Sequence, residues 1–382
     1  MRVAIDIRRA GDFGLGTYIR NIVNQFARTD RETEYLLIGQ PSHVAQFDRL
    51  PDNFKLLEYE AQPGSFYTHV HLPFLLRKRG VDILHMPWFY APALVSTRLV
   101  MTVHDLTDVL VPLPGMPAMV QAGRLYFARR ALARADRILA VSHSTKREVS
   151  RMFDVPEGKI EVVYNALDER FLREPAPADA ERILERHAVT DPFVLYAGNI
   201  KPQKNLPRLI EAFAVAKGEL RDHPVYSKLK LLLIGDSAEE HSDLRRAVLR
   251  SRVQDDVRFL GFVPHSVLRV FYSRASAFLF PSLYEGFGLP PLEAMAHGAP
   301  VLTSSVSSLP EVFSQAALLV NPENIFEIAR GIRQILTEDD LRETLVRRGY
   351  ELVRKYSWER SAEQVREVYR SVAAGEPSKN PE

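Results

Sequence analysis

The apolar residues of this chain gather in short continuous runs, and longer amphipathic stretches separate these runs. Short continuous apolar runs are typical of strands that are buried on both faces of a parallel sheet. Stretches that repeat apolar residues every three or four positions are typical of helices that cover such a sheet. The alternation of the two patterns therefore predicts an α/β chain built from strands and helices in turn.

The predicted elements run through almost the whole chain. Strands are expected near residues 3–7, 35–38, 55–59, 82–85, 99–103, 135–142, 160–163, 193–198, 229–235, 257–263, 277–280 and 300–303. Helices are expected near residues 17–27, 67–79, 119–134, 144–153, 207–216, 290–297, 326–336, 340–356 and 358–373.

The length of the chain and one internal likeness indicate two domains. At 382 residues the chain is too long for one ordinary core and suits two. Residues 135–142 resemble residues 275–282 in register, which indicates two similar doubly wound halves. Residues 174–178, rich in proline and alanine, are the best candidate for a linker. We therefore predict an N-terminal domain over residues 1–173 and a C-terminal domain over residues 174–357.

Composition narrows the class of protein. Apolar residues make up 46% of the chain, so global disorder is disfavoured. Lysine and arginine total 50 against 48 acidic residues, and this net charge of +2 argues against a dedicated nucleic-acid binder. Cysteine is absent, which excludes disulfides and thiolate chemistry and fits a cytoplasmic location. We see no signal peptide and no apolar run of about 18 residues, so we expect a soluble or at most peripheral protein.

The densest cluster of candidate chemistry follows the predicted strand 277–280. A glycine-rich loop leads into a short helix, which Pro290 opens and Gly298 closes. Gly286 and Gly288 are expected to leave backbone N–H groups uncovered beside the helix N-terminus, where phosphate binds well. In an open parallel sheet such a loop lies at the carboxyl ends of the strands, where ligands bind.

Two carboxylates flank this predicted anion site. Glu285 lies in the loop and Glu293 about one turn inside the helix, so hydroxyl groups on either side of a phosphate could donate hydrogen bonds to them. A nucleotide-sugar has this layout of sugar, diphosphate and ribose. Alternatively, Glu293 is a capping or dipole-stabilising carboxylate without contact to a ligand.

The stretch from Ser282 to Val301 resembles the signature of the retaining glycosyltransferases of family 4, in which two glutamates enclose seven residues. The resemblance implies the GT-B fold, in which two Rossmann-like doubly wound domains face a central cleft. It implies that the C-terminal domain binds a nucleotide-sugar donor and the N-terminal domain an acceptor. It also implies that the helix 358–373 packs back on the N-terminal domain; residues 374–382 are expected to form a flexible tail.

The resemblance assigns roles in the N-terminal half. The glycine loop before the helix at 17–27 would face the donor through Gly14 and Gly16, although a tight turn without a ligand remains the alternative. A nicotinamide cofactor is disfavoured, because Ile19 stands where the dinucleotide fingerprint needs its third glycine. His104 follows the strand 99–103, and the resemblance makes it a catalytic residue that contacts the transferred sugar. Its neighbour Asp105 is expected to be structural.

The resemblance also assigns donor contacts in the C-terminal half. Lys204, at a predicted helix N-terminus, would bind the diphosphate. The family often has an arginine shortly before this lysine, and whether Lys201 replaces it is open. Glu285 would be catalytic as well as donor-binding. The full set of implied donor contacts is Gly14, Gly16, Asn199, Lys204, Phe262, Val263, Glu285, Gly286, Phe287, Gly288, Leu289 and Glu293.

We expect no metal and no cofactor. The sequence contains no Asp-x-Asp, no His-Glu-x-x-His and no phosphate loop that ends in Gly-Lys-Ser or Gly-Lys-Thr. Backbone donors and Lys204 would then stabilise the leaving diphosphate. The sequence offers no obvious carboxylate nucleophile, so we favour a front-face mechanism with retention.

The donor and the acceptor are less defined by the sequence. Residues 198–202 and 103–106 look most like bacterial mannosyl-type members, which favours GDP-mannose, with UDP-linked hexoses next. The acceptor would be a cell-surface glycan or a lipid-linked saccharide. A nucleotide-sugar epimerase and a catalytically silent nucleotide-sugar binder are the alternatives from other classes.

The predicted helix 119–134 carries Arg124, Arg129, Arg130 and Arg134 together with apolar residues. A basic amphipathic helix can lie on an anionic membrane surface. A solvated basic face on a helix packed against the core is the commoner arrangement. Peripheral contact with the inner membrane surface is therefore an open hypothesis.

Overall fold

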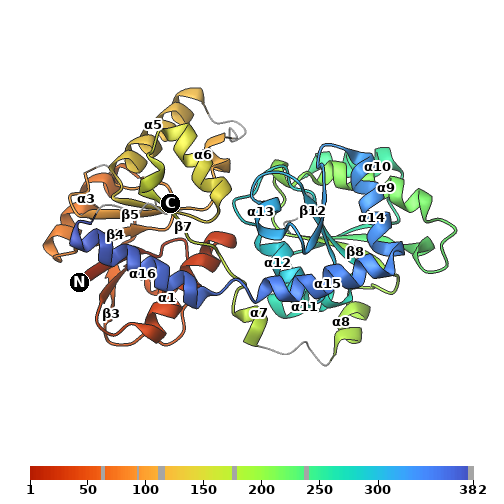
Figure 1. Cartoon of the computed structure of the whole chain (residues 1–382), viewed down its shortest axis with the longest axis horizontal. Coiled ribbons are helices and arrows are strands. Elements are labelled where there is room, and N and C mark those ends of the chain that lie inside the picture. Colours follow the sequence, from red (N-terminus) through yellow and green to blue (C-terminus); the bar gives the residue numbers. More distant parts are fainter. Residues whose placement is uncertain (62–64, 93, 111–116, 174–178, 236–240, 377–382) are drawn as a thin grey trace. The chain divides into compact units, whose positions relative to one another are not determined.

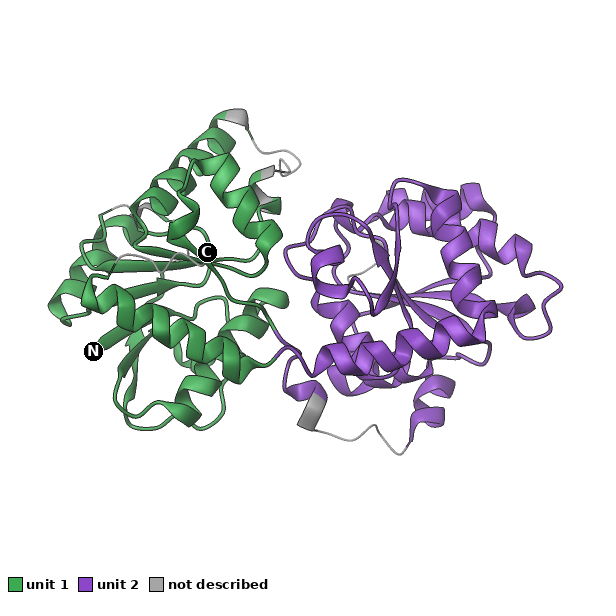
Figure 2. Cartoon of the chain, in the orientation of Figure 1, with its two compact units in different colours: residues 1–165, 357–382 green, residues 166–356 purple. Residues whose placement is uncertain are grey.

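The computed structural model describes residues 1–61, 65–92, 94–110, 117–173, 179–235 and 241–376. These residues form two compact units, shown in separate colours in Figure 2. The first unit comprises Met1–Asn165 with Ser357–Glu382, and the second comprises Ala166–Tyr356. Each unit is built on one parallel sheet, as predicted.

The first boundary lies slightly earlier than the predicted one at residue 173. Phe171 belongs to the second unit because its ring contacts His265 and His297, with ring centroids 5.3 and 5.6 Å apart. The predicted linker, residues 174–178, lies outside the described residues, and so does most of the predicted tail.

The first unit contains a parallel sheet of seven described strands in the order β3-β2-β1-β4-β5-β6-β7. Strands β1, β4 and β5 are apolar and almost completely buried, so each must be covered on both faces. The strands are β1 (Arg2–Asp6), β2 (Glu34–Gly39), β3 (Phe54–Glu58), β4 (Ile83–Met86), β5 (Arg98–Val103), β6 (Arg137–Ala140) and β7 (Ile160–Val162). The helices are α1 (Gly14–Thr29), α2 (Pro41–Val44), α3 (Phe66–Lys78), α4 (Thr107–Leu110), α5 (Ala118–Arg134), α6 (His143–Phe153), the 3-10 turn η1 (Glu157–Lys159) and α16 (Trp358–Ala374).

The second unit contains a parallel sheet of six described strands in the order β10-β9-β8-β11-β12-β13. The strands are β8 (Phe193–Ala197), β9 (Lys230–Ile234), β10 (Val257–Gly261), β11 (Ala277–Phe280), β12 (Val301–Ser304) and β13 (Ala317–Val320). The helices are α7 (Arg170–Arg173), α8 (Ala180–Arg186), η2 (Pro202–Lys204), α9 (Leu206–Glu219), η3 (Tyr226–Lys228), α10 (Ser242–Ser251), α11 (His265–Arg274), α12 (Leu289–Ala296), α13 (Leu309–Phe313), α14 (Ile325–Thr337) and α15 (Asp339–Val353). In this unit β13, α7, α8, α10, α11 and α13 were not predicted from the sequence.

Each sheet reverses its strand order once. In the first unit the reversal lies between β1 and β4, and in the second between β8 and β11. Ligands of open parallel sheets bind outside the carboxyl ends of the strands at such a point. In the second unit the loops that leave β8 and β11 carry Lys204 and Glu285, so the fold brings these two residues to its expected binding position.

The last helix, α16, belongs to the first unit and lies beside α1 (Figure 1). The hydroxyl of Ser361 donates to the carbonyl of Tyr164 at 2.7 Å, and the Arg366 guanidinium lies 3.6 Å from the Asp30 carboxylate. Helix α16 therefore completes a unit whose described strands all come from residues before Asn165. None of the helices within the described ranges is long and apolar enough to cross a membrane.

Candidate active site

The loop between β11 and α12 has the predicted strand, glycine loop and helix order. Gly288 precedes α12 with φ of 98°, a conformation that L side chains rarely adopt. A Cβ atom there would lie 2.9 Å from side-chain atoms of both Leu309 and Phe313, so only glycine fits. No side chain caps the N-terminus of α12. The first turn of this helix is therefore suited to an anionic ligand.

Two serines fix the backbone of Glu285 in this loop. Ser307 Oγ donates to the Glu285 carbonyl at 2.6 Å and accepts from the Glu285 N–H at 3.2 Å. Ser308 Oγ donates to the same carbonyl at 2.9 Å. Ser307 itself has φ of 60°, a conformation that is uncommon for residues other than glycine. The loop after β12 thus holds Glu285 in place, a role that the sequence analysis did not assign to either serine.

Lys204 and Glu285 form an ion pair. The Lys204 Nζ lies 2.5 Å from Glu285 Oε1 and 5.0 Å from the centroid of the Phe280 ring. The side chains are only 11% and 13% exposed, so the pair is partly withdrawn from water. An anion that binds at α12 would therefore compete with Glu285 for the Lys204 ammonium group. Both residues were predicted from the sequence, but their contact was not.

Asn205 ties the loop after β8 to the loop after β11. It adopts φ of 62°, and its Nδ2 donates to the carbonyls of Pro281 and Pro322 at 3.1 and 2.7 Å. The Leu283 N–H also donates to the Gln203 carbonyl at 2.8 Å. These bonds hold Lys204 near Glu285, because Gln203 and Asn205 flank Lys204 and Leu283 lies two residues before Glu285. Asn205 is a positioning residue that the sequence analysis missed.

Glu293 lies on α12 beyond its first turn, which contains no acidic residue. This position disfavours the alternative of a capping carboxylate. The Tyr272 hydroxyl donates to Glu293 Oε2 at 2.9 Å. Burial raises the pKa of the Glu293 carboxyl to about 7, and the negative charge of Asp168 acts in the same direction. A donor hydroxyl near this carboxyl would meet a group that titrates close to neutrality.

The raised pKa of Glu293 predicts a pH-dependent stability effect. Between the ordinary value of 4.5 and about 7, the folded state binds more protons at this group than the unfolded chain, so its contribution to stability falls as the pH rises. Glutamine does not titrate. The stability of Glu293→Gln relative to wild type should therefore rise by about 1–2 kcal/mol across this window, allowing for partial exposure.

Urea denaturation at pH 4.5, 6 and 7.5 measures this difference. Glu323→Gln, a change of the same kind at an exposed position, is the matched control and should change the stability by less than about 0.5 kcal/mol at each pH. A flat difference for Glu293→Gln would contradict the prediction.

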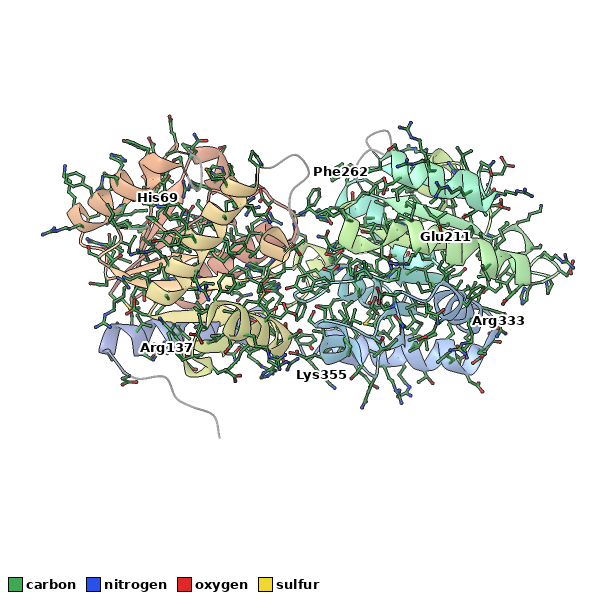
Figure 3. All side chains as sticks on the ribbon, turned by 90° about the horizontal axis from the view of Figure 1, so that it is seen from above. His69, Arg137, Glu211, Phe262, Arg333 and Lys355 are labelled. Atoms are coloured by element: carbon green, nitrogen blue, oxygen red, sulfur yellow. The ribbon has the colours of Figure 1, made fainter. Side chains whose placement is uncertain are left out.

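The remaining predicted residues of the second unit lie around these loops. Asn199 follows Gly198, and its carbonyl accepts a hydrogen bond from the Tyr196 hydroxyl at 2.8 Å. Phe262 is 70% exposed (labelled in Figure 3), whereas the Val263 side chain is buried. Phe262 therefore offers a flat apolar surface to a ligand, while Val263 could offer only its backbone. Lys201 is exposed, unlike Lys204.

The glycine loop of the first unit is tightly wound. The helix α1 begins at Gly14, three residues earlier than predicted. A Cβ at Gly16 would lie 2.5 Å from the carbonyl oxygen of Ala10, so this position requires glycine for close packing of the turn. The Arg20 guanidinium donates to the same carbonyl. This packing explains Gly16 without a ligand, and donor contact at Gly14 and Gly16 stays a prediction.

His104 follows β5 in the first unit and has one ring nitrogen unpaired. A hydrogen bond joins its ring to the Pro87 backbone, while Nε2 is buried without a hydrogen-bond partner. Because a carbonyl only accepts, Nδ1 carries the proton and Nε2 presents a lone pair. Burial lowers the pKa of His104 to about 4, so the ring is neutral near pH 7. Asp105 accepts the Thr107 N–H at 2.8 Å and thereby orders the turn.

A buried chain of hydrogen bonds lies behind His104. The Tyr369 hydroxyl of α16 contacts His85 Nδ1 at 2.5 Å, and His85 Nε2 contacts Thr102 Oγ1 at 2.8 Å. The Tyr18 hydroxyl lies 3.0 Å from the same Thr102 oxygen. The Tyr18 ring packs edge-on against His104, with centroids 4.8 Å apart. The last helix of the chain thus supports the histidine through α1, β4 and β5.

Removal of one hydroxyl tests this chain. Tyr369→Phe should lower the free energy of unfolding by about 1–3 kcal/mol, because Nδ1 of buried His85 loses its partner. Urea denaturation measures the change. Tyr350→Phe, on the exposed side of α15, should cost less than about 0.5 kcal/mol. Equal losses for the two variants would show that the buried chain contributes nothing specific.

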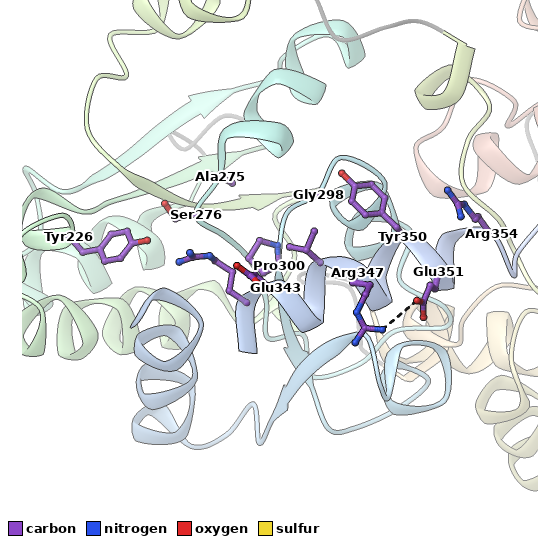
Figure 4. A pocket seen from close by; sticks show the side chains of 12 residues that line it. Tyr226, Ala275, Ser276, Gly298, Pro300, Glu343, Arg347, Tyr350, Glu351 and Arg354 are labelled. Carbon is purple, nitrogen blue, oxygen red and sulfur yellow. Dashed lines mark ion pairs between the residues drawn. The ribbon is translucent and has the colours of Figure 1, made fainter. Parts of the chain in front are cut away.

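A groove of about 740 Å³ lies elsewhere on the second unit (Figure 4). It is lined by Ser276 and Pro300, which precede β11 and β12, and by α15 residues that include the ion pair of Arg347 and Glu351. It therefore lies at the amino ends of the strands, away from Glu285. Within the described ranges, no group of three or more His, Asp or Glu side chains could hold a metal ion. Independence from metal stays a prediction.

Comparisons with known proteins cover both units. Residues 14–171 match the family described as Glycosyltransferase Family 4, and residues 179–352 match Glycosyl transferases group 1. The O-antigen chain mannosyltransferase B of Escherichia coli is 32% identical over 293 residues, which are 75% of this chain and 74% of that protein.

Solved structures agree on the fold. The sucrose-phosphate synthase of Thermosynechococcus elongatus superposes with a TM-score of 0.75 at 23% identity, over 98% of this chain and all of that one. Anabaena HepE, solved with UDP and glucose, gives 0.74 at 16% identity, over 97% of this chain and all of that one. The predicted GT-B fold is thereby confirmed. The chain belongs to the glycosyltransferase family that these two family models describe, whose members transfer sugars from nucleotide-sugars to saccharide acceptors.

Proposed function

We propose that this glycosyltransferase moves a hexose from a nucleotide-sugar to a saccharide or lipid-linked acceptor, with retention of the anomeric configuration and without a metal ion. Mannose from GDP-mannose is the first candidate, because the Escherichia coli relative is named a mannosyltransferase. UDP-linked hexoses are the second candidate, because HepE holds UDP and glucose. We propose that the enzyme works in the cytoplasm; a lipid-linked acceptor would bring it to a membrane surface.

The observation that carries this proposal is the contact of Lys204 with Glu285 beside the uncapped N-terminus of α12. This site brings together three groups that can bind a sugar diphosphate: a helix N-terminus, an ammonium group and a carboxylate. The helix N-terminus and the ammonium group attract the diphosphate. The carboxylate accepts hydrogen bonds from sugar hydroxyls once the diphosphate has taken over Lys204.

The other residues follow from their surroundings. Glu293, which Tyr272 holds by a hydrogen bond, would accept a hydrogen bond from a ribose hydroxyl on the far side of the diphosphate. Phe262 would cover the nucleobase with its exposed ring. The unpaired Nε2 of His104 would accept a hydrogen bond from a hydroxyl of the transferred sugar. A neutral imidazole suits this role, because it offers an acceptor without repelling a positively charged sugar ring.

The reaction would proceed on one face of the sugar. The bond from the anomeric carbon to the diphosphate oxygen breaks, and the acceptor oxygen bonds to the same face of that carbon. The acceptor proton passes to the leaving phosphate oxygen. Lys204 and the N–H groups of α12 stabilise the negative charge that grows on the diphosphate.

Thermal stabilisation by nucleotides tests the donor. A nucleoside diphosphate at about 100 times its dissociation constant should add about 2.7 kcal/mol to the stability of the protein. GDP should act more strongly than UDP, ADP, dTDP or NAD, and EDTA should leave the effect unchanged. NMR of the product would then report whether the anomeric configuration is retained. Stabilisation by NAD alone would contradict the proposal, and conversion of the donor without an acceptor would favour an epimerase.

A further inference from the structure

Two neighbouring helices of the first unit carry an unusual concentration of exposed apolar side chains. The rings of His69 on α3 and Phe127 on α5 lie 5.4 Å apart, so the two helices are in contact (His69 is labelled in Figure 3). Of the seventeen large apolar side chains that are exposed in the described residues, eight lie on these two helices. They form what we call the α3–α5 face: Tyr67, Val70, Phe74, Met119, Val120, Leu125, Tyr126 and Phe127.

The spacing of these residues makes a continuous surface on each helix. On α3, Tyr67, Val70 and Phe74 are separated by three and four positions, which puts them on one side. On α5, Met119 is 86% exposed, and Tyr126 and Phe127 follow two turns later on the same side. The opposite side of α5 packs inward through Ala128 and Leu132. Helix α5 therefore has both an apolar inner face and an apolar outer face.

The charged residues of the two helical segments are all basic. Neither residues 65–79 nor residues 117–134 contain an aspartate or a glutamate. The two segments carry Arg77, Lys78, Arg79, Arg124, Arg129, Arg130 and Arg134. The whole chain has a net charge of only +2, so this local excess is not a general property of the protein.

Some of these arginines already have partners inside the unit. Arg134 lies 3.2 Å from Asp136 and donates to the Thr97 carbonyl, and Arg124 donates to the Tyr90 hydroxyl at 2.9 Å. Arg129 and Arg130 are exposed, with the Arg130 guanidinium over the Tyr126 ring. Exposed basic groups therefore stand directly beside exposed aromatic rings.

We propose that the α3–α5 face docks on an anionic lipid bilayer. Exposed apolar patches mark interaction surfaces, and a helix with aromatic and aliphatic residues beside Lys and Arg is suited to the membrane interface. Each basic group near an anionic surface contributes attraction, and the long side chains can reach the headgroups while the rings enter the acyl boundary. The absence of acidic residues on both helices favours this partner over a protein surface of mixed charge.

Co-sedimentation of the full-length protein with vesicles tests the docking. Vesicles of phosphatidylcholine with 30% phosphatidylglycerol should bind the protein, and pure phosphatidylcholine should bind it at least ten-fold more weakly. Binding should fall several-fold in 0.5 M NaCl, because salt screens the charges. Equal binding to both vesicles, or no binding, would overturn the proposal.

Two variants separate the contributions of charge and apolar contact. Arg129→Glu with Arg130→Glu changes only exposed groups and should weaken binding to anionic vesicles at least ten-fold. Phe74→Ser with Met119→Ser should weaken it several-fold without changing its dependence on salt. The matched control is Phe326→Ser with Arg330→Glu on exposed positions of α14, which should bind as wild type does.

The remaining outcomes of these experiments also test the docking proposal. If the wild type forms a dimer in the absence of lipid and the α3–α5 variants abolish it, the face is a protein interface and the proposal is wrong. Turnover with a water-soluble acceptor should be unchanged in all these variants. If the wild-type protein has normal turnover but does not bind vesicles, only the docking proposal is wrong. If it binds vesicles but has no turnover, only the proposed sugar transfer is wrong.

Discussion

Glu285→Gln is expected to lower turnover by a factor of roughly 10²–10³, because the amide cannot stabilise the charge that develops on the transferred sugar. The same variant should bind the nucleoside diphosphate product several-fold more tightly than wild type. Glu285 pairs with Lys204 at 2.5 Å, and glutamine would leave that ammonium group available to the diphosphate. Turnover and affinity should therefore change in opposite directions.

Steady-state kinetics and calorimetry with the nucleoside diphosphate measure the two effects separately. Glu285→Ala should lower turnover similarly, whereas Glu323→Gln, at an exposed position of the same unit, should change neither quantity. Near-wild-type turnover in Glu285→Gln would refute a catalytic role for this residue. A parallel loss of turnover and affinity would indicate that the variant damages the loop rather than the chemistry.

Lys204→Met is expected to weaken binding of the nucleoside diphosphate by a factor of about 10–100, because charged hydrogen bonds contribute about 1.5–3 kcal/mol. The variant also leaves Glu285 without its cation in a partly buried position, so the empty protein should lose stability as well. Methionine keeps the length of the lysine side chain but lacks the ammonium group, whose nitrogen lies 5.0 Å from the centroid of the Phe280 ring.

Lys201→Met is the control for this variant, since Lys201 is exposed and three residues away. Its effect on affinity should be less than about three-fold if Lys204 alone meets the diphosphate. A loss equal to that of Lys204→Met would mean that Lys201 fills the place of the arginine that the family often has. Unchanged affinity in Lys204→Met would remove Lys204 from the site altogether.

The sequence predicted the parts of this site better than their contacts. The strand, loop and helix around Glu285 could be predicted because glycine and proline mark such turns locally. The ion pair between Lys204 and Glu285 could not be predicted, since it depends on which strands become neighbours. Only the pairing of β8 with β11 brings these two residues together across 81 positions of sequence.

Hydrogen-bond partners that lie on distant loops could not be predicted for the same reason. Ser307 and Asn205 are small polar residues whose roles appear only once their hydrogen-bond partners are placed. The sequence also left two interpretations of Glu293 open, because a carboxylate near a helix start has an ordinary explanation. The position of Glu293 beyond the first turn and its bond to Tyr272 disfavour that explanation. The strand β13 was missed because its short apolar run follows directly on the turn after α13.

The return of α16 to the first unit has a consequence for synthesis on the ribosome. Strands β1 to β7 emerge first. The face of their sheet that carries α1 is not covered by α16, however, until the residues after 357 have been translated. During that interval His85 has no Tyr369 beside it, and the apolar surface that α16 will cover is open to water. The second unit, by contrast, is contiguous in sequence and can fold as it leaves the ribosome. The first unit is therefore translated first but completes its folding last. A chain truncated before Trp358 would have a folded second unit joined to an incomplete first unit.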